Sequence, residues 1–285
     1  MQKYSVLMSV YDKESPENLE SSLKSMLDQT VCPEEIIVVE DGPLNKQLKM
    51  VINKLSIENP NIIKSIPLEK NVGLGKALDI GIEYCKYELI ARMDSDDISL
   101  PNRCELQLKK FNSNPNLVLL GTMIDEFYDD PNKIISSRVV PTEYSAIKKF
   151  MRRRSPFNHP TVMYKKSAVK TAGGYGEMKR KQDLDLFSRM INKGYHAENL
   201  SESLLLFRSN RDNYRRRKSW SYCKSYIDVQ LQIFKRGHCT FLDFLYVLIT
   251  QMIIYIIPYK LWVFVSDKLL RKNNIVKEDL YEKTN

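Results

Sequence analysis

The stretch "ELIARMDSDD", Glu88 to Asp97, joins an apolar β-strand directly to three aspartates. Two carboxylates about 4 Å apart repel by roughly 1 kcal/mol in water, and by about 4 kcal/mol at an effective dielectric constant of 20. A fold does not gather Asp94, Asp96 and Asp97 at a strand end for stability alone. Residues two apart point to the same side of an extended chain, so Asp94 and Asp96 can face one point. A hard divalent cation, Mg²⁺ or Mn²⁺, is the simplest partner that neutralises them, and such ions also bind substrate phosphates.

Helix capping is the competing interpretation of these acids. Asp97 and Ser99 precede a predicted helix that has Pro101 near its first turn. Carboxylates stabilise that positive end of the helix dipole. Capping accounts for one of the three acids, or for two at most, so we favour the metal site.

The segments around this strand alternate between strand and helix patterns. Apolar runs rich in β-forming residues predict strands at "YSVLMSVY" (4–11), "EIIVVEDG" (35–42), "IIKSIPL" (62–68), "ELIARMD" (88–94) and "LVLLGTMIDEFY" (117–128). Helices are predicted between them, at "SPENLESSLKSML" (15–27), 45–57, "NVGLGKALDIGIEYC" (71–85) and "SLPNRCELQLKKF" (99–111). This order with short connections predicts an α/β fold, with a mostly parallel central sheet flanked by helices on both faces.

Polar signals follow three of these predicted strands. They are "SVYD" after the first strand, "VEDGP" after the second and "RMDSDD" after the fourth. Parallel sheets bind ligands at the carboxyl ends of their strands. We therefore expect one binding site to collect these three segments.

The charge of the chain is uneven. Its 285 residues carry a net charge of +9. Much of that excess lies in "MRRRS" (151–155) and "RDNYRRRK" (211–218), which predicts an anionic partner such as phosphates, a membrane surface or nucleic acid. A non-catalytic binder of nucleic acid or anionic lipid is one hypothesis, but no helix-turn-helix, zinc-finger or RNP pattern supports it. We therefore expect no nucleic-acid partner.

Cysteines and the N-terminal stretch indicate the compartment. The five cysteines are widely spaced, without a CxxC pair or zinc spacing, so we interpret them as reduced thiols. The N-terminal stretch "MQKYSVLMSVYDKE" contains polar and acidic residues too early in the chain for a secretory signal. The expected location is the cytoplasm.

The pattern loosens beyond Pro141. A Gly-rich turn is predicted at 173–176, a helix near Asp183, and an amphipathic helix over 220–236. The uncharged run "FLYVLITQMIIYIIPY" (244–259) is shorter than the ~20 apolar residues of a spanning helix. Aromatic and basic residues typical of membrane interfaces accompany it: Tyr255, Tyr259, Trp262, Phe264, Lys268, Arg271 and Lys272. Attachment to the membrane surface is favoured over a buried core or dimer helix and over a spanning or re-entrant segment.

Five segments together resemble a known family, the family-2 glycosyltransferases with the GT-A nucleotide-diphospho-sugar fold. They are "SVLMSVYD", "EIIVVEDGP", "EKNVGLGKALDIGI", "DSD" within "RMDSDDISLPNR", and "QDLDLFSRM", in the family's order from Tyr4 to Tyr195. The region of the last segment looks like that of bacterial surface-polysaccharide enzymes. The resemblance implies a transferase domain over 1–236, in which 1–125 binds the nucleotide sugar and 126–236 the acceptor. Residues 237–285 would form a helical, membrane-associating tail.

The resemblance also implies a donor site. The backbone of Val10 and Tyr11, with Asp41, would hold the uridine, although Asp41 before Gly42 is also typical of a turn. The other residues that would contact the nucleotide sugar are Gly73, Lys76, Asp94, Ser95 and Asp96. Asp96, supported by Asp94, would bind Mn²⁺ or Mg²⁺.

On the acceptor side, the resemblance implies that Asp183 is the catalytic base. The acidic residue that usually precedes it in the family is Gln182 here. Asp185 is the second choice of base, while His159 and Arg189 are weaker candidates for contacts to the acceptor, the metal or the diphosphate.

The predicted function is the inverting, metal-dependent transfer of a hexose from a UDP-sugar to a hydroxyl of a glycan. The tail suggests a lipid-diphosphate-linked acceptor at the inner face of the cell membrane, for assembly of a surface polysaccharide such as O-antigen. A sugar-phosphate nucleotidyltransferase is the alternative. Such an enzyme normally has a Gly-rich, basic signature after the first strand, whereas "SVYDKESPENLE" is acidic there.

Overall fold

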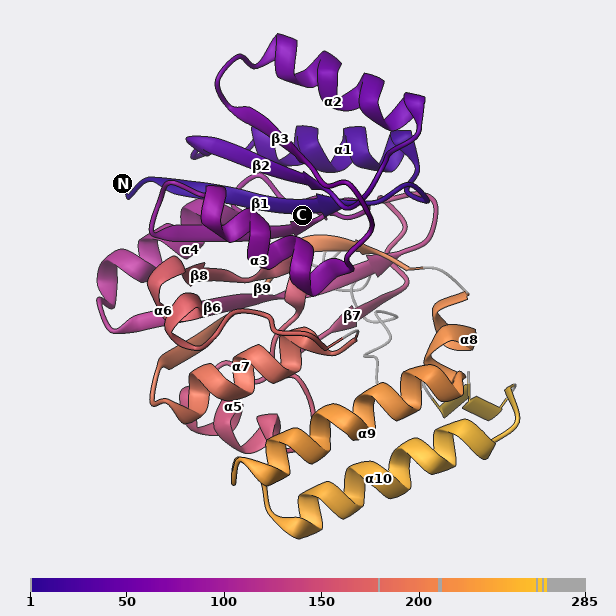
Figure 1. Cartoon of the computed structure of the whole chain (residues 1–285). Coiled ribbons are helices and arrows are strands. Elements are labelled where there is room, and N and C mark those ends of the chain that lie inside the picture. The colour runs from indigo at the N-terminus through magenta and orange to yellow at the C-terminus, as the bar shows by residue number, and fades with distance from the viewer. Residues whose placement is uncertain (1, 179, 210–211, 260, 263, 266–285) are drawn as a thin grey trace, which may run out of the picture.

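The computed structural model describes residues 2–178, 180–209, 212–259, 261–262 and 264–265, and these build one central sheet with helices around it (Figure 1). Among these residues the sheet has the order β3-β2-β1-β4-β8-β6-β9-β5, with β7 paired to β6. The strands are β1 (Tyr4–Val10), β2 (Glu35–Glu40), β3 (Ile63–Pro67), β4 (Leu89–Asp94), β5 (Ile98–Ser99), β6 (Leu117–Phe127), β7 (Ser136–Arg138), β8 (Met163–Lys165) and β9 (His196–Arg208).

Helices cover both faces of this sheet. Those of the first half are α1 (Pro16–Leu27), α2 (Lys46–Glu58), α3 (Leu74–Tyr84) and α4 (Arg103–Ser113). Those of the second half are α5 (Tyr144–Met151), the short η1 (His159–Thr161), α6 (Lys166–Thr171), α7 (Gln182–Asn192), α8 (Asp212–Lys218), α9 (Trp220–Lys235) and α10 (Phe241–Ile256). Each helix predicted in the first half is confirmed, with shifts of a few residues at its ends.

Alternate side chains of the central strands build two separate cores. On β1, Val6 and Met8 join the core with α1, α2 and α4, whereas Leu7 joins the core with α3, α6 and α7. This period of two is the strand geometry that the apolar runs predicted. Burial on both faces explains why the strands read as continuous apolar segments rather than alternating ones.

The direction of the strands changes halfway across the sheet. β1 pairs in parallel with both β2 and β4, and β2 pairs in parallel with β3, as predicted. Beyond β4 the sheet is mixed rather than parallel, because β8 runs antiparallel to both β4 and β6, while β9 is parallel to β6. The three-residue β8 follows η1 directly, without a crossover helix, so it enters the sheet in the opposite direction.

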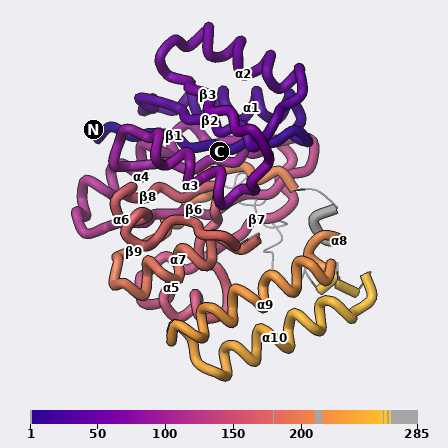
Figure 2. Tube along the Cα trace, in the orientation of Figure 1, coloured from indigo at the N-terminus to yellow at the C-terminus, as the bar shows by residue number. Residues whose placement is uncertain are grey.

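The last described helices form a separate layer. Figures 1 and 2 show α9 and α10 lying side by side, close to α5 and α7. The Thr240–Asp243 capping box starts α10 at Phe241, three positions before the predicted apolar run. Among the helices described, none combines the length and the apolar character needed to cross a bilayer. The predicted basic residues Lys268, Arg271 and Lys272 lie outside the described residues.

A buried acid on β2 ties three parts of the first half together. Glu35, only 1% exposed, accepts hydrogen bonds from Ser5 Oγ (2.8 Å), the Lys86 N–H (2.5 Å) and Lys64 Nζ (2.9 Å). Burial by itself would raise the pKa of Glu35, but these donors bring that pKa below its ordinary value. The ionised carboxylate therefore stabilises the folded state.

We expect Glu35→Gln to lower the free energy of unfolding by about 2 kcal/mol at pH 7, since buried donors lose a charged acceptor. A carboxyl with a lowered folded pKa stabilises the protein above its unfolded pKa of about 4.3 and stops doing so as pH falls through the folded pKa. The difference in unfolding free energy between variant and wild type should therefore become smaller below pH 4. Urea unfolding at several pH values measures this difference. The exposed neighbour Glu34→Gln is the matched control, with an expected change below about 0.5 kcal/mol.

Candidate functional site

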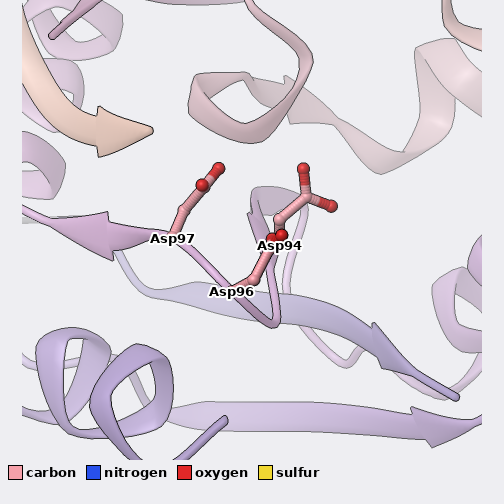
Figure 3. Close-up of side chains that lie close together, drawn as sticks. All are labelled: Asp94, Asp96 and Asp97. Carbon is pink, nitrogen blue, oxygen red and sulfur yellow. The ribbon is translucent and has the colours of Figure 1, made fainter. Parts of the chain in front are cut away.

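Three carboxylates converge at the carboxyl end of β4. Asp94 is the last residue of that strand, and Asp96 and Asp97 follow in the turn before β5. One carboxylate oxygen of each lies within 4.8 Å of the others (Figure 3). The predicted convergence of Asp94 and Asp96 is therefore present, and Asp97 joins them.

Asp97 is not a helix cap. The helix that was expected to follow it, α4, begins at Arg103 with Asn102 at its N-cap. Asp97 is fully buried, and its Oδ1 accepts the backbone N–H of Arg208 on β9 at 2.9 Å. The capping interpretation is wrong because the two-residue strand β5 (98–99) intervenes between the acids and the helix.

The acids of this cluster are buried and close together, which disfavours their ionised forms. Burial and the charges of Asp94 and Glu14 raise the pKa of Asp96 to about 7. Burial and the charges of Asp96 and Asp94 raise the pKa of Asp97 well above its ordinary value. Asp97 Oδ2 is buried without a hydrogen-bond partner among the described atoms. Several hard oxygen donors around one point, one of them unsatisfied, fit a divalent cation such as Mg²⁺ or Mn²⁺.

Two partners of the cluster were missed by the sequence reasoning. Arg92, buried inside the sheet, donates a hydrogen bond from its guanidinium to Asp94 Oδ1. Ser95 Oγ donates to Glu14 Oε2 at 3.0 Å, which brings a fourth acid close to Asp96. The period of two along β4 places Arg92 on the same side as Asp94 and was the signal that could have found it. Glu14 precedes α1, and no local pattern links it to residues eighty positions later.

The ends of β1 and β2 meet the loop before α3. Asp41, which is 5% exposed, accepts the N–H of Val72 (2.6 Å) on Oδ1 and that of Gly73 (3.1 Å) on Oδ2. Its own N–H donates to the carbonyl of Val10 at 2.7 Å. Gly73 has a φ of 87°, which side chains rarely adopt. Val10, Asp41 and Gly73 are therefore brought together. The strand-end argument predicted this for Val10 and Asp41, whereas Gly73 was named only through the family resemblance.

Other predicted donor residues lie around this junction. The side chain of Tyr11, next to Val10, is exposed. Lys76 Nζ on α3 lies 3.4 Å from Glu177 of the Gly-rich turn, and both side chains are exposed. An added Cβ at Gly75 would lie 3.2 Å from Gln182 Cγ, so the first turns of α3 and α7 touch. This contact gives the glutamine before Asp183 a packing role.

One cavity of about 880 Å³ joins the two halves of the site. Its walls include both Asp94 and Asp183, together with His159 and Lys181. Asp183 is in the first turn of α7, where the helix dipole favours a carboxylate. Lys181 adopts a left-handed conformation (φ 60°) at the start of that helix, and its Nζ lies over the rings of Tyr222 (5.0 Å) and Tyr226 (4.6 Å). Asp41 and Asp96 are not among the cavity walls.

His159 has a definite partner within this cavity wall. Its Nε2 lies 2.9 Å from Tyr175 Oη, and its ring meets that of Phe187 edge-on. Burial and the positive charge of Arg92 lower the pKa of His159 well below its ordinary value, so the ring is neutral. His159 is therefore a neutral hydrogen-bonding group in the cavity wall.

Asp185 and Arg189, the weaker candidates for acceptor contacts, are bonded to other protein groups in this structure. Asp185 is buried and accepts hydrogen bonds from Arg189 Nε (3.0 Å) and Arg236 (2.6 Å). Arg189 also donates to the carbonyls of Ala172 and Gly174, which holds the Gly-rich turn. Residues two apart on a helix face different directions, so Asp185 points away from the side that carries Asp183. Both residues support the fold, and neither lines the cavity.

The fold and the site together define a class of protein. A sheet with a parallel first half, an acidic cluster at the end of β4 and a facing acid on α7 are the features expected of GT-A-type glycosyltransferases. Residues 5–171 match the family described as glycosyl transferase family 2, and the chain therefore belongs to that family. The resemblance stated from the sequence motifs is confirmed, and sugar transfer is favoured over nucleotidyl transfer.

Relatives of the chain support the same class. It is 41% identical over 228 residues, covering 80% of this chain and 84% of the relative, to the amylovoran biosynthesis glycosyltransferase AmsE of Erwinia amylovora. It is 33% identical over 270 residues, covering 95% and 97%, to the UDP-Gal:alpha-D-GlcNAc-diphosphoundecaprenol beta-1,3-galactosyltransferase of Escherichia coli. The protein is thus a glycosyltransferase similar to enzymes of polysaccharide biosynthesis.

Solved structures confirm the fold. The mannosyltransferase PcManGT from Pyrobaculum calidifontis, in complex with GDP-Man and Mn²⁺, superposes with a TM-score of 0.64 at 11% identity, covering 94% of this chain and 76% of that one. S. aureus TarS 1-349 in complex with UDP-GlcNAc superposes with a TM-score of 0.60 at 17% identity, covering 81% and 66%. At these identities the likeness concerns the fold alone.

Proposed function

We propose that this protein transfers a hexose from a UDP-sugar, with inversion, to a hydroxyl of a lipid-diphosphate-linked glycan in surface polysaccharide assembly. One observation carries the proposal: Asp94 of the acid cluster and Asp183 of α7 border the same cavity. A donor held at the acid cluster and an acceptor held at Asp183 would therefore meet in one enclosed space. The names of the two relatives, one of which states a UDP-sugar donor and a diphosphate-linked acceptor, support this choice.

On the donor side, the proposed uridine contacts are the backbone of Val10 and Tyr11 and the carboxylate of Asp41. Asp41 already shapes the loop at Gly73 through two backbone N–H groups, and a carboxylate has lone pairs to accept a third donor. Lys76, exposed at the start of α3, would reach the nucleotide by leaving Glu177.

Asp94, Ser95 and Asp96 would hold the sugar nucleotide through Mn²⁺ or Mg²⁺, with Asp96 and Asp94 as ligands. When bound, such an ion supplies a Lewis acid for the charge that builds on the departing UDP. Arg92 keeps Asp94 in place from inside the sheet, and Asp97 adds a third carboxylate.

Asp183 is the proposed base. The acceptor hydroxyl loses its proton as its oxygen attacks the anomeric carbon from the side opposite to UDP, so a carboxylate must lie on that side. Asp183 borders the same cavity as Asp94, which supports this role, and the neutral His159 in the same wall would hydrogen-bond to the acceptor sugar. We assign donor binding to residues 1–125 and acceptor binding to 126–236, as expected from the sequence.

A panel of UDP-sugars with a synthetic lipid-diphosphate acceptor tests this function. UDP release that needs both the acceptor and a divalent ion, and that EDTA abolishes, is the expected result. A product with the anomeric configuration of the donor would contradict the inverting mechanism. Release that persists at full rate in EDTA would contradict the role of the metal.

We also propose that the outer face of α10 attaches the enzyme to an anionic membrane surface, as part of the tail predicted at 237–285. Leu242, Ile253 and Ile256 on this face are all more than half exposed. The basic helix α8 lies at the end of α10, where Arg215 stacks over the ring of Tyr259 and Lys218 donates to the carbonyl of Tyr255. Apolar, aromatic and basic side chains in this order fit the interface of an anionic bilayer.

Replacing Ile249 and Ile253 together by Asp should weaken binding to anionic vesicles by about 30-fold or more, because two exposed apolar side chains no longer enter the lipid. Co-sedimentation with vesicles measures this partition. Ile57→Asp on α2, which is equally apolar and 80% exposed, is the matched control and should bind vesicles as wild type does. Equal vesicle binding by the double variant and the control would exclude the α10 face as the attachment surface.

A further inference from the structure

Arginines form a large part of the cavity that Asp94 and Asp183 border. They come from β7, from the segment after α5 and from α8, and we call them the arginine wall: Arg138, Arg152, Arg153, Arg154 and Arg217. The sequence showed two separate basic runs, at 151–155 and 211–218, and predicted an anionic partner without indicating that the runs meet. The fold brings members of both runs, and Arg138, into one cavity.

Only one member of the arginine wall forms an ion pair within the described residues, although the carboxylate of Glu126 also lines the cavity. Arg153 pairs with Asp243 of α10 at 2.5 Å and stacks over the ring of Tyr246. Within the described part of the chain, no ion pair is formed by the other four members of the wall. The wall therefore has guanidinium groups available for an anion.

Arg138 has the clearest need for a counter-charge. Its Nε is buried and has no hydrogen-bond partner among the described atoms. Burial, together with the positive charges of Arg217 and Arg154, lowers the pKa of Arg138 to about 10, although the negative charge of Glu126 acts in the opposite direction. These arginines are thus close enough to repel one another. A guanidinium kept unpaired beside like charges is destabilising unless a ligand neutralises it.

The same cavity also has an apolar wall. The inner face of α10 contributes Val247, Ile254 and the ring of Tyr246, and Trp262 lies beyond it. The positions 243, 247, 250 and 254 on α10 follow a helical spacing, so one side of the helix lines the cavity while the opposite side is exposed. A carboxylate at Asp183, a cluster of guanidinium groups and an apolar wall therefore share one space.

We propose that Arg138, Arg154 and Arg217 bind the diphosphate of the acceptor, whose sugar lies toward Asp183 and whose lipid leaves along α10. This inference rests on the proposed function and adds the residues that recognise the acceptor. The guanidinium fork matches phosphate oxygens in a bidentate manner, and two linked phosphates give several acceptor oxygens to three arginines. The donor diphosphate is not the occupant, since its charge is assigned to the acid cluster and a divalent ion.

Binding without catalysis is the first test. The probe is a hexose joined through a diphosphate to a short alkyl chain, titrated calorimetrically in EDTA so that the acid cluster holds no metal. We expect wild type to bind it, and Arg154→Gln with Arg217→Gln to bind about 100-fold more weakly, at about tenfold for each lost charged contact. The matched control is Lys148→Gln with Arg216→Gln, two exposed cations beside the same segments that do not line the cavity. Equal affinities of the double variant and the control would overturn the proposal.

Steady-state kinetics with two acceptors is the second test. One acceptor has the diphosphate, and the other has the same sugar on a neutral alkyl chain. The double variant should raise KM for the diphosphate acceptor about 100-fold, leave KM for the UDP-sugar within twofold, and match wild type on the neutral acceptor. A rise in KM for the UDP-sugar instead would assign the arginines to the donor and overturn the proposal.

Two further outcomes separate this proposal from its neighbours. The double variant could keep its affinity for the probe but lose binding to anionic vesicles. That outcome would show that the arginines face lipid headgroups and would overturn the proposal. The wild type could also bind the probe in EDTA and yet transfer no sugar, while the double variant loses this binding. That outcome would support the subsite and contradict the proposed function. Arg138→Gln is the second variant, and unchanged thermal unfolding confirms that each variant is folded.

Discussion

Asp183→Asn is expected to lower kcat about 1000-fold while KM for the UDP-sugar changes less than threefold. The amide cannot take the proton of the acceptor hydroxyl, and general base catalysis contributes about 10²–10⁴ in rate. Because Asn keeps the size of the side chain and its place in the first turn of α7, donor binding at the acid cluster should be untouched. UDP release at saturating substrates measures the effect.

Asp185 offers a matched control on the same helix. Asp185→Asn removes the charge that pairs with Arg189 and Arg236, so it should lower the free energy of unfolding by about 3 kcal/mol. Its kcat per folded molecule should stay within a few fold of wild type. The opposite pattern, with a large loss of kcat for Asp185→Asn and a small one for Asp183→Asn, would reverse the assignment of the base.

Asp96→Ala is expected to lower kcat/KM at least about 1000-fold and to abolish binding of Mn²⁺ at micromolar concentrations. One of three converging carboxylates is then lost, and the remaining two leave an incomplete set of hard oxygen ligands. Titration of Mn²⁺ followed by electron paramagnetic resonance measures the binding separately from the reaction. Asp12→Ala, an exposed aspartate near the end of β1, is the control and should bind Mn²⁺ as wild type does.

The same substitution should have the opposite effect on stability without metal. Crowding of the acids and burial raise the pKa of Asp96 to about 7, so the folded state holds a proton that the unfolded chain gives up near pH 4. Asp96 therefore makes a contribution that lowers the stability of the metal-free protein as pH rises from about 4 to 7. Asp96→Ala removes this contribution, and its Tm at pH 7.5 in EDTA should exceed that of wild type by about 2 °C or more. A lower Tm together with full transfer activity would contradict the metal site.

These two predictions show where stability and function oppose each other. Four acids, with Glu14 included, lie near one point and repel, and the arginine wall repels in the same way within the adjoining cavity. Each group of like charges is costly in the free protein, and binding of the proposed ligand would offset that cost. Substitutions that relieve either repulsion should stabilise the fold and impair binding, as is common at functional sites.

Local patterns in the sequence were sufficient for the first half of the molecule. Apolar runs, helix caps and short connections fully specify β1 to β4 as parallel strands, because crossover connections between adjacent strands allow only one hand. The convergence of Asp94 and Asp96 was also predictable, since residues two apart point to one side of an extended chain, whereas Asp97 joins them through the turn before β5. Val10 and Asp41 converged for the related reason that parallel strands end at the same edge.

The second half depended on contacts between distant segments. The strand β9 was missed because polar and charged residues interrupt its apolar pattern, and its long pairing with β6 stabilises it instead. The pairing of Asp185 with Arg236 was not predicted, because Arg236 lies 51 positions away at the end of another helix. The hydrophobic periodicity of the sequence does not indicate which side chain of α7 contacts the end of α9.

Sequence alone thus determined the family, the parallel half of the sheet and the acid cluster, because each depends on residues that are neighbours in the chain or on one strand edge. Tertiary structure alone decided that Asp183 shares a cavity with Asp94, and that Arg138, Arg154 and Arg217 line it. The physical reason is that packing of α5, α7, α8 and α10 brings these side chains together across gaps of many residues. These distances depend on how whole helices pack against one core, and a short segment of sequence does not determine that packing.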